Sequence, residues 1–238
     1  MPTTRAPLAQ LPAGLPHLQD QATRLVGLGV HELAGLGARD LCERARGLQT
    51  DVADGPALLV MSPQLVPASL LAPLLCSADG KAGFVVEDMC DVDLFLPLGE
   101  VHVPDSPVYV LTNLDRGDHM ANWSPDEALP ALLTEGRTPL LLSEGIQWVV
   151  HAPAVLARNH CFMTIGSRRR KPDGALDARV AALWISNGTG RDGRERRHAP
   201  KVGWCWAGNR HTWLGFASAG ARKTHAEQRQ RPVVPSLS

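Results

Sequence analysis

The spacing of apolar positions predicts that the first two thirds of the chain is rich in helices. Within residues 19–28, and again within residues 38–48, apolar side chains recur every three or four positions, which is the period of one helical face. Helices are also expected at 66–76 and at 143–151, the latter capped by Ser143. A further helix should run from 124 to about 134, because Ser124 can cap it, Pro125 suits its first position and Glu127 completes a capping box.

Short apolar runs between these helices predict strands. The runs at 57–61, 84–86 and 107–111 have the length of buried strands. Three more strands are expected at 159–165, 180–185 and 201–206, joined by polar loops. Because consecutive strands usually pair with each other, the last three predict a three-stranded antiparallel C-terminal meander. Helices and strands do not alternate regularly, so the fold class is α+β, with a helix-rich N-terminal part packed with short strands.

The ends of the chain lack this periodicity. Residues 1–16 contain four prolines and are predicted to be a flexible tail. Residues 221–238 are polar and basic, and we expect a disordered tail there as well. The region between them, 17–220, is expected to be a single α+β domain.

Composition places the chain among ordinary globular proteins. Apolar residues make up 44% and charged residues 20% of the sequence. No run approaches the length of about 18 apolar residues that a membrane span needs, and the N-terminus does not resemble a signal peptide. We therefore expect a cytoplasmic protein without a membrane partner.

The formal net charge of zero conceals an uneven distribution. Residues 1–157 carry 8 Lys and Arg against 19 Asp and Glu, whereas residues 158–238 carry 16 against 5. A basic face of this kind attracts nucleic acid or an acidic protein partner. The other interpretation is that the basic half faces the acidic half of the same molecule. Both remain open at the level of sequence.

The best candidate for a functional site is a tryptophan-rich motif at residues 201–215, with the sequence KVGWCWAGNRHTWLG. It holds three of the six tryptophans and mixes them with polar side chains. In an extended strand, Trp204 and Trp206 share one face, and Gly203 and Cys205 share the other. The glycine is expected to leave open space next to the Cys205 thiol.

Two chemistries fit this motif. A cysteine and a histidine within hydrogen-bonding reach can form a nucleophile and base pair, so Cys205 and His211 are candidate catalytic residues. His211 would serve as the general acid or base, because imidazoles ordinarily titrate near neutral pH. A pair of Cys161 with His198 is an alternative. Neither pair matches the local signature of a known cysteine enzyme, so the chain is left unclassified as an enzyme.

The second chemistry is binding of a polar anionic small molecule. Trp206 and Trp213 would form apolar walls, Asn209 and His211 would supply hydrogen bonds, and a nearby cation would neutralise the anion. The remaining candidate binding residues are the cations and the start of the first meander strand: Lys201, Arg210, His160 and Cys161. No metal site is expected, because His160 and Cys161 are adjacent on a strand and point to opposite faces. The sequence identifies no cofactor and no oligomeric state.

Several segments of the chain resemble a family found in actinobacteria that is catalogued only as a domain of unknown function. The resemblance rests on the tryptophan-rich motif, GWCWAGN followed by HTWLG, and on the runs NHCF and ALWIS that precede it. It covers roughly residues 20–220. It implies no reaction, cofactor or partner, so the binding of a small molecule stays the favoured function and docking of nucleic acid or an acidic protein the alternative.

Overall fold

The computed structural model of this protein describes residues 14–52 and 56–225. Of the predicted tails at 1–16 and 221–238, residues 1–13 and 226–238 lie outside the described residues. None of the described helices is long and apolar enough to cross a membrane. Helices and strands are both abundant and belong to several sheets, so the chain has the predicted α+β class.

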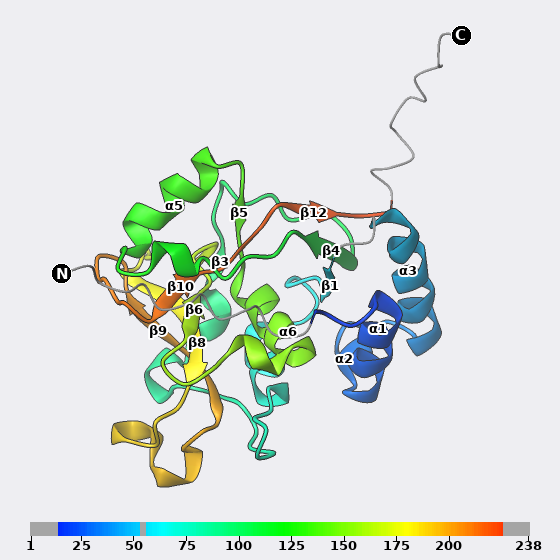
Figure 1. Ribbon diagram of the computed structural model, residues 1–238. Coiled ribbons are helices and arrows are strands. Elements are labelled where there is room, and N and C mark those ends of the chain that lie inside the picture. The colour runs from blue at the N-terminus through cyan, green and yellow to red at the C-terminus, as the bar shows by residue number, and fades with distance from the viewer. Residues whose placement is uncertain (1–13, 53–55, 226–238) are drawn as a thin grey trace, which may run out of the picture.

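The N-terminal helices pack on a three-stranded antiparallel sheet. Three helices, α1 (Leu18–Gly27), α2 (Val30–Leu33) and α3 (Ala38–Asp51), come first, and the sheet has the order β1-β4-β12. Its strands are β1 (Ala57–Met61), β4 (Val108–Thr112) and β12 (Ala221–Lys223). The last described strand therefore returns to the first sheet and ends beside α3 (Figure 1).

The outer edge of β1 is covered by side-chain amides instead of a fourth strand. Gln21 of α1 accepts a hydrogen bond from the Leu59 amide at 2.9 Å and donates to the Ala57 carbonyl at 2.8 Å. Gln147 accepts from the Met61 amide at 2.8 Å and donates to the Met61 carbonyl at 3.1 Å. Because buried backbone groups need partners, these two glutamines permit β1 to end the sheet inside the protein.

The second sheet has five strands in the order β10-β6-β8-β9-β2. Its centre is the predicted antiparallel meander of β6 (Cys161–Met163), β8 (Arg179–Ile185) and β9 (Pro200–Trp206). Two short strands extend it in parallel, β10 (Leu214–Phe216) beside β6 and β2 (Phe84–Val85) beside β9. The meander prediction is confirmed, and the two added strands were not predicted as its neighbours.

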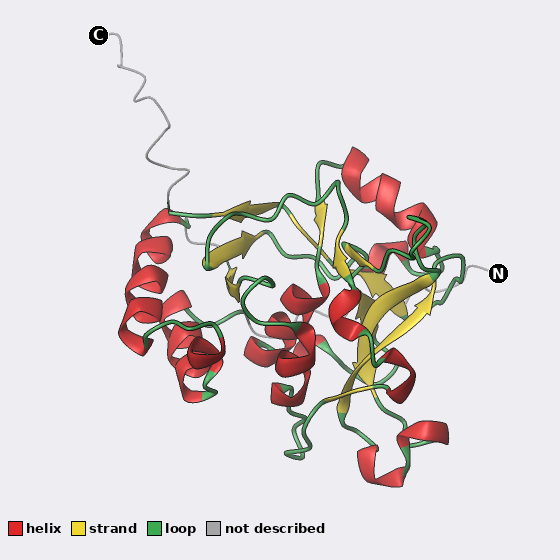
Figure 2. Ribbon diagram, turned by 180° about the vertical axis from the view of Figure 1, so that it is seen from behind, coloured by secondary structure: helices red, strands yellow, loops and turns green. Residues whose placement is uncertain are grey.

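Both faces of this sheet are covered by helices (Figure 2). Helix α6 (Leu142–His151) lies between the two sheets, and all ten of its residues are buried. A methyl group at Gly145 would lie 2.5 Å from Thr164, so glycine lets α6 approach the sheet. Helix α5 (Pro125–Thr134) covers the opposite face over a second apolar core. Its predicted capping box is confirmed, with Ser124 and Glu127 bonded to each other's backbone amides.

Short elements connect these layers. Strands β3 (Leu96–Pro97) and β7 (Ser167–Arg168) pair with each other, as do β5 (Thr138–Pro139) and β11 (Ser218–Ala219). The remaining pieces are helix α4 (Ala68–Leu71) and the single-turn 3-10 helices η1 (Ala72–Leu74), η2 (Glu87–Met89), η3 (Val92–Leu94), η4 (Asp118–Met120), η5 (Pro153–Val155), η6 (Gly190–Asp192) and η7 (Arg194–Arg196).

Two expectations about helix ends were wrong. The helix expected at 66–76 is reduced to α4 and η1, because Pro73 cannot donate the backbone hydrogen bond that would continue an α-helix. Ser143 does not cap α6, since the cap position is Leu141 and Ser143 lies within the first turn. Glu144 instead accepts the hydrogen bond of the Leu141 amide at 2.7 Å.

The structure also differs from the predicted C-terminal boundary. Residues from 221 on were assigned to a disordered basic tail, yet Ala221–Lys223 forms β12. The reason is Arg222, whose guanidinium is buried against both oxygens of Glu144, each at 2.7 Å. Tyr109 also donates to Glu144 at 2.7 Å, and burial, then the neighbouring carboxylate, raises the pKa of this tyrosine well above its ordinary range. Composition alone predicted a solvated arginine where the fold buries one.

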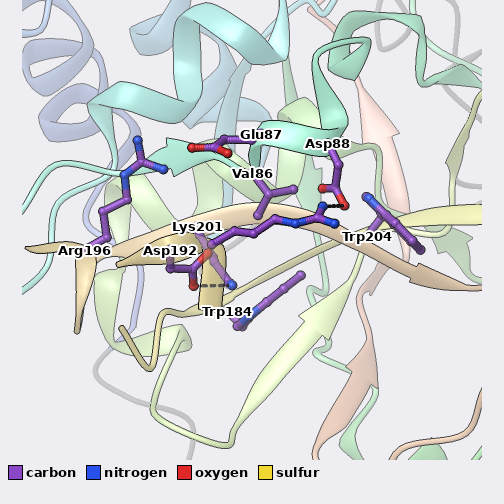
Figure 3. Close-up of a pocket in the computed structure, with 9 residues that line it drawn as sticks. Val86, Glu87, Asp88, Trp184, Asp192, Arg196, Lys201 and Trp204 are labelled. Carbon is purple, nitrogen blue, oxygen red and sulfur yellow. Dashed lines mark hydrogen bonds and ion pairs between the residues drawn. The ribbon is translucent and has the colours of Figure 1, made fainter. Parts of the chain in front are cut away.

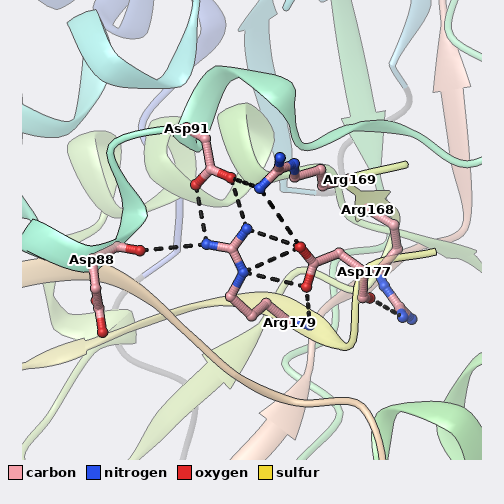
Figure 4. Close-up of polar contacts among 6 residues, drawn as sticks. All are labelled: Asp88, Asp91, Arg168, Arg169, Asp177 and Arg179. Atoms are coloured by element: carbon pink, nitrogen blue, oxygen red, sulfur yellow. Dashed lines mark hydrogen bonds and ion pairs between the residues drawn. The ribbon is translucent and has the colours of Figure 1, made fainter. Parts of the chain in front are cut away.

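The acidic and basic halves of the sequence pair within the molecule. Arg179 bridges Asp91 at 2.7 Å and Asp177 at 2.9 Å, and Arg169 also contacts Asp91 (Figure 4). The hydrogen bond from Arg179 lowers the pKa of Asp177 to about 2 and lowers the pKa of Asp91 as well. Further pairs of this kind are Arg191 with Asp88, Arg210 with Glu127 and Arg222 with Glu144. The second interpretation of the uneven charge distribution therefore accounts for much of it.

Candidate functional site

The tryptophan-rich motif forms β9, a turn and β10. Val202 and Trp204 face the main core together with Leu183 of the neighbouring strand, as strand alternation predicts. Trp206 continues on that face, where its ring meets Trp204 edge-on with centroids 4.5 Å apart. Unlike Trp204, Trp206 lies at the end of the strand and is exposed. Trp213, just before β10, is exposed as well.

The structure brings the two candidate catalytic residues together. The Sγ atom of Cys205 lies 2.9 Å from Nε2 of His211. The backbone amide of Asn122 donates to the His211 carbonyl at 2.8 Å, which fixes the turn, and the Trp213 ring packs at 5.0 Å from the imidazole. Asn209 lies in the turn between Cys205 and His211, and its side chain interacts with the Cys205 thiol. This part of the predicted constellation is thus assembled in space.

The electrostatics of this pair do not favour a thiolate. Burial raises the pKa of Cys205, and the Trp206 amide and the Asn209 side chain offset only part of that effect. Among the described residues, none accepts a hydrogen bond from the second ring nitrogen of His211. A cysteine nucleophile normally has a lowered pKa and a base that a third group orients. The geometry therefore favours a neutral thiol donating to an imidazole.

This assignment predicts slow alkylation of Cys205. At pH 7, iodoacetamide should modify it at least about fivefold more slowly than the exposed Cys76 and Cys90, because the thiolate is the reactive form. Site-resolved mass spectrometry of the intact and the His211→Ala protein measures the rates. A fast reaction with a midpoint below pH 7, lost in His211→Ala, would contradict the neutral thiol and favour a catalytic pair.

The space expected beside the thiol is filled. A methyl group placed on Gly203 would lie 2.6 Å from the Trp184 ring and 3.2 Å from Val86. Trp184 reaches this position from β8, where it is opposite Lys201 in the register. The glycine serves close packing of an indole against the strand. The prediction of an opening at this position was wrong for that reason.

The other predicted binding residues have partners away from the thiol. Arg210 pairs with Glu127 of α5. His160 lies 3.1 Å from Asp118, which also pairs with the buried Arg116 at 3.1 Å. Cys161 is buried, and burial raises its pKa to about 11. His198, its alternative partner, instead lies 3.5 Å from Asp79.

A cavity of about 320 Å³ adjoins the first half of β9 (Figure 3). Trp184 and Trp204 form its apolar walls, and Lys201 of β9 lines it opposite Trp184 of β8. The remaining lining comes from the segment after β2 and from the loop that joins β8 to β9: Val86, Glu87, Asp88, Arg191, Asp192 and Arg196. The sequence pointed to this basic loop but not to the acidic side of the cavity.

Ion pairs organise the cavity. Lys201 donates to Asp192 at 2.5 Å, and its ammonium lies 4.7 Å from the centroid of Trp184. Ser186 donates to the same carboxylate at 2.6 Å. Arg191, from the loop between β8 and β9, pairs with Asp88 at 3.0 Å and so joins the two sides of the cavity lining. Lys201 is therefore held at the cavity wall and not at the Cys205 end of the strand.

One cation of the cavity has no carboxylate partner among the described residues. The Arg196 guanidinium lies 4.5 Å from the centroid of Phe84 and makes no ion pair there. Stacking on the ring leaves the N–H groups at the guanidinium edge free to donate. In Figure 3 its side chain lies across the cavity from the Trp184 and Trp204 walls. This is the position where an added anion would be neutralised.

The described residues contain no group of three or more His, Cys, Asp or Glu side chains arranged to hold a metal ion.

Comparison with known proteins gives one family: a model described as a family of unknown function, DUF5701, matches residues 24–225. No curated protein matches the chain. No solved structure matches it either.

Proposed function

The chain belongs to this family of unknown function, and we propose from its geometry that it binds a small anionic molecule in the cavity between Trp184 and Trp204. The observation that carries the proposal is Arg196, a guanidinium at the cavity without a carboxylate partner in the described part of the chain. Arginine side chains suit carboxylate and phosphate groups, which they can bind through two parallel hydrogen bonds.

The shape and polarity of the cavity support a small molecule with a flat apolar part. Its volume of about 320 Å³ lies at the small end of the range of ligand sites. The indoles of Trp184 and Trp204 give the cavity apolar ring surface that a ligand can contact. Lys201 has three N–H donors, and Asp192 accepts from one of them, so the ammonium can also donate to a ligand oxygen.

We assign no reaction to this site. The pair of Cys205 and His211 lies at the far end of β9, with exposed Trp206 and Trp213 beside it, and its thiol is held neutral. In the proposed function this end of the motif stabilises the turn between β9 and β10. The proposed ligand site includes Lys201 and Trp204 of β9 but no residue of the turn between β9 and β10.

Titration of the intrinsic tryptophan fluorescence with citrate, phosphate and benzoate tests the proposal. Arg196→Ala should weaken binding of the preferred anion by about tenfold to a hundredfold, the effect of losing a charged hydrogen bond. Arg194→Ala is the matched control, because Arg194 belongs to the same turn η7, is exposed and does not line the cavity. Equal weakening in both variants, or none in Arg196→Ala, would contradict the assignment.

Docking of nucleic acid or an acidic protein is the alternative, and it has weaker support. Arg169, Arg179, Arg191 and Arg210 of the basic half already pair with carboxylates of the same chain. At these four side chains a phosphate could bind only by displacing a carboxylate. The small-molecule proposal needs no such exchange at Arg196.

A further inference from the structure

A second cavity lies at the start of α6 and is different in character. Its volume is about 420 Å³, and most of its wall is apolar, with side chains such as Ala68, Val92, Phe95 and Leu142. Leu96 lines it too and is itself exposed, as is the nearby Leu94. This cavity, which we call the α6 cavity, therefore offers an apolar interior bordered by apolar surface.

One polar group of the α6 cavity lacks a partner. Ser143 lines the cavity and is only 5% exposed, and its hydroxyl oxygen makes no hydrogen bond to any residue that the structure describes. Its backbone amide also has no acceptor among the described residues. The neighbouring amides are satisfied, that of Leu141 by Glu144 at 2.7 Å and that of Leu142 by the Ser167 hydroxyl at 3.0 Å. A buried hydroxyl and a first-turn amide without partners are the groups that a ligand acceptor would satisfy.

The charges around the α6 cavity exclude an anion as the preferred ligand. No lysine or arginine lines it, and its one charged residue is Asp93. Asp93 accepts two hydrogen bonds from Ser69, from the amide at 2.9 Å and the hydroxyl at 2.6 Å, so it is a fixed negative charge. A carboxylate in this site would be desolvated beside Asp93 without a compensating cation. A neutral acceptor avoids that cost and still bonds to Ser143.

We propose that the α6 cavity binds an uncharged small molecule with an apolar body and a carbonyl oxygen that accepts hydrogen bonds from Ser143. The ligand class differs from that of the cavity between Trp184 and Trp204, which is expected to bind an anion. The two sites share no lining residue, so either proposal can fail without the other.

Two isosteric compounds test the neutral-carbonyl site on the full chain. The ketone 4-phenyl-2-butanone and the carboxylate 3-phenylpropionate differ only in a methyl group replaced by a charged oxygen. In amide-resolved NMR titrations at pH 7, the ketone should shift the resonances of Ser143 and Ala68 and bind there at least about tenfold more tightly than the carboxylate. Equal affinities at this cavity, or no shifts there up to the solubility limit of the ketone, would overturn the proposal.

Variants locate the interaction. Ser143→Ala should weaken ketone binding at least about fivefold, and its Tm should stay the same or rise, because the hydroxyl it removes has no partner among the described residues. Ser77→Ala, a change at a turn serine that does not line this cavity, should leave binding unchanged. Arg196→Ala should also leave ketone binding unchanged, which separates this site from the anion site. An unchanged affinity in Ser143→Ala would overturn the assignment of that residue.

Discussion

Replacing Arg222 by methionine is expected to lower the free energy of unfolding by about 3–5 kcal/mol, the usual cost of removing one partner of a buried ion pair. The guanidinium is 3% exposed and the Glu144 carboxylate is fully buried. Arg222 also donates to the Pro139 carbonyl at 3.0 Å, so it joins β12, β5 and α6. Without it, Glu144 keeps a buried charge whose remaining contacts include the Tyr109 hydroxyl and the Leu141 amide.

Urea denaturation at pH 7 measures this loss. Arg39→Met is the matched control, since Arg39 forms an exposed pair with Glu43 at 2.7 Å, and solvent-exposed pairs contribute little to stability. The double variant Arg222→Met with Glu144→Gln should recover part of the loss, because it removes the unpaired charge. A cost for Arg222→Met no larger than that for Arg39→Met would show that Arg222 is not buried in solution.

The second large effect is expected from His151 and depends on pH. This residue ends α6, is 5% exposed, and neither ring nitrogen has a hydrogen-bond partner within residues 14–52 and 56–225. Burial, with a smaller effect of Arg24, lowers its pKa from 6.5 to about 3. As pH falls, the unfolded chain therefore takes up the proton first. The stability from the neutral imidazole is complete above about pH 6.5 and is lost progressively toward pH 3.

Between pH 7 and pH 5, the free energy of unfolding that is lost through His151 amounts to about 2 kcal/mol. Most carboxylates titrate at lower pH, so they do not obscure this loss. The free energy of unfolding of His151→Leu should fall less over that interval, by about this amount, than that of the natural chain. His102→Leu serves as the control, because His102 is exposed and should not alter the slope. Parallel pH profiles for His151→Leu and the natural chain would contradict the burial of a neutral imidazole.

The parts of the fold that could be predicted from sequence are those with local signals. The Ser124 capping box and the three strands of the meander lie where the pattern placed them. Strand β2 was predicted at 84–86, whereas β10 has three residues, too few to show a period, and the parallel pairing of both strands is decided by distant contacts. The position of β12 depends on the buried partner of Arg222, which no local pattern can supply.

The candidate site shows the same division. The contact between Cys205 and His211 could be expected because a short turn separates them. The packing of Trp184 against Gly203 could not, since it depends on the register of two strands. Asp88 and Arg196 meet at one cavity from positions more than a hundred residues apart. The spacing of residues within one motif does not indicate which distant residues will line the same cavity.

The pair of glutamines that covers β1 also bears on how the chain avoids self-association. The sequence of β1, ALLVM, is uncharged, free of proline and strongly apolar, which is the composition of segments that stack into fibrils when their edges are open. Many proteins guard such an edge with a lysine, a proline or a bulge. Here Gln21 and Gln147 occupy its donors and acceptors from within, so a wholly apolar strand is kept from pairing with another molecule.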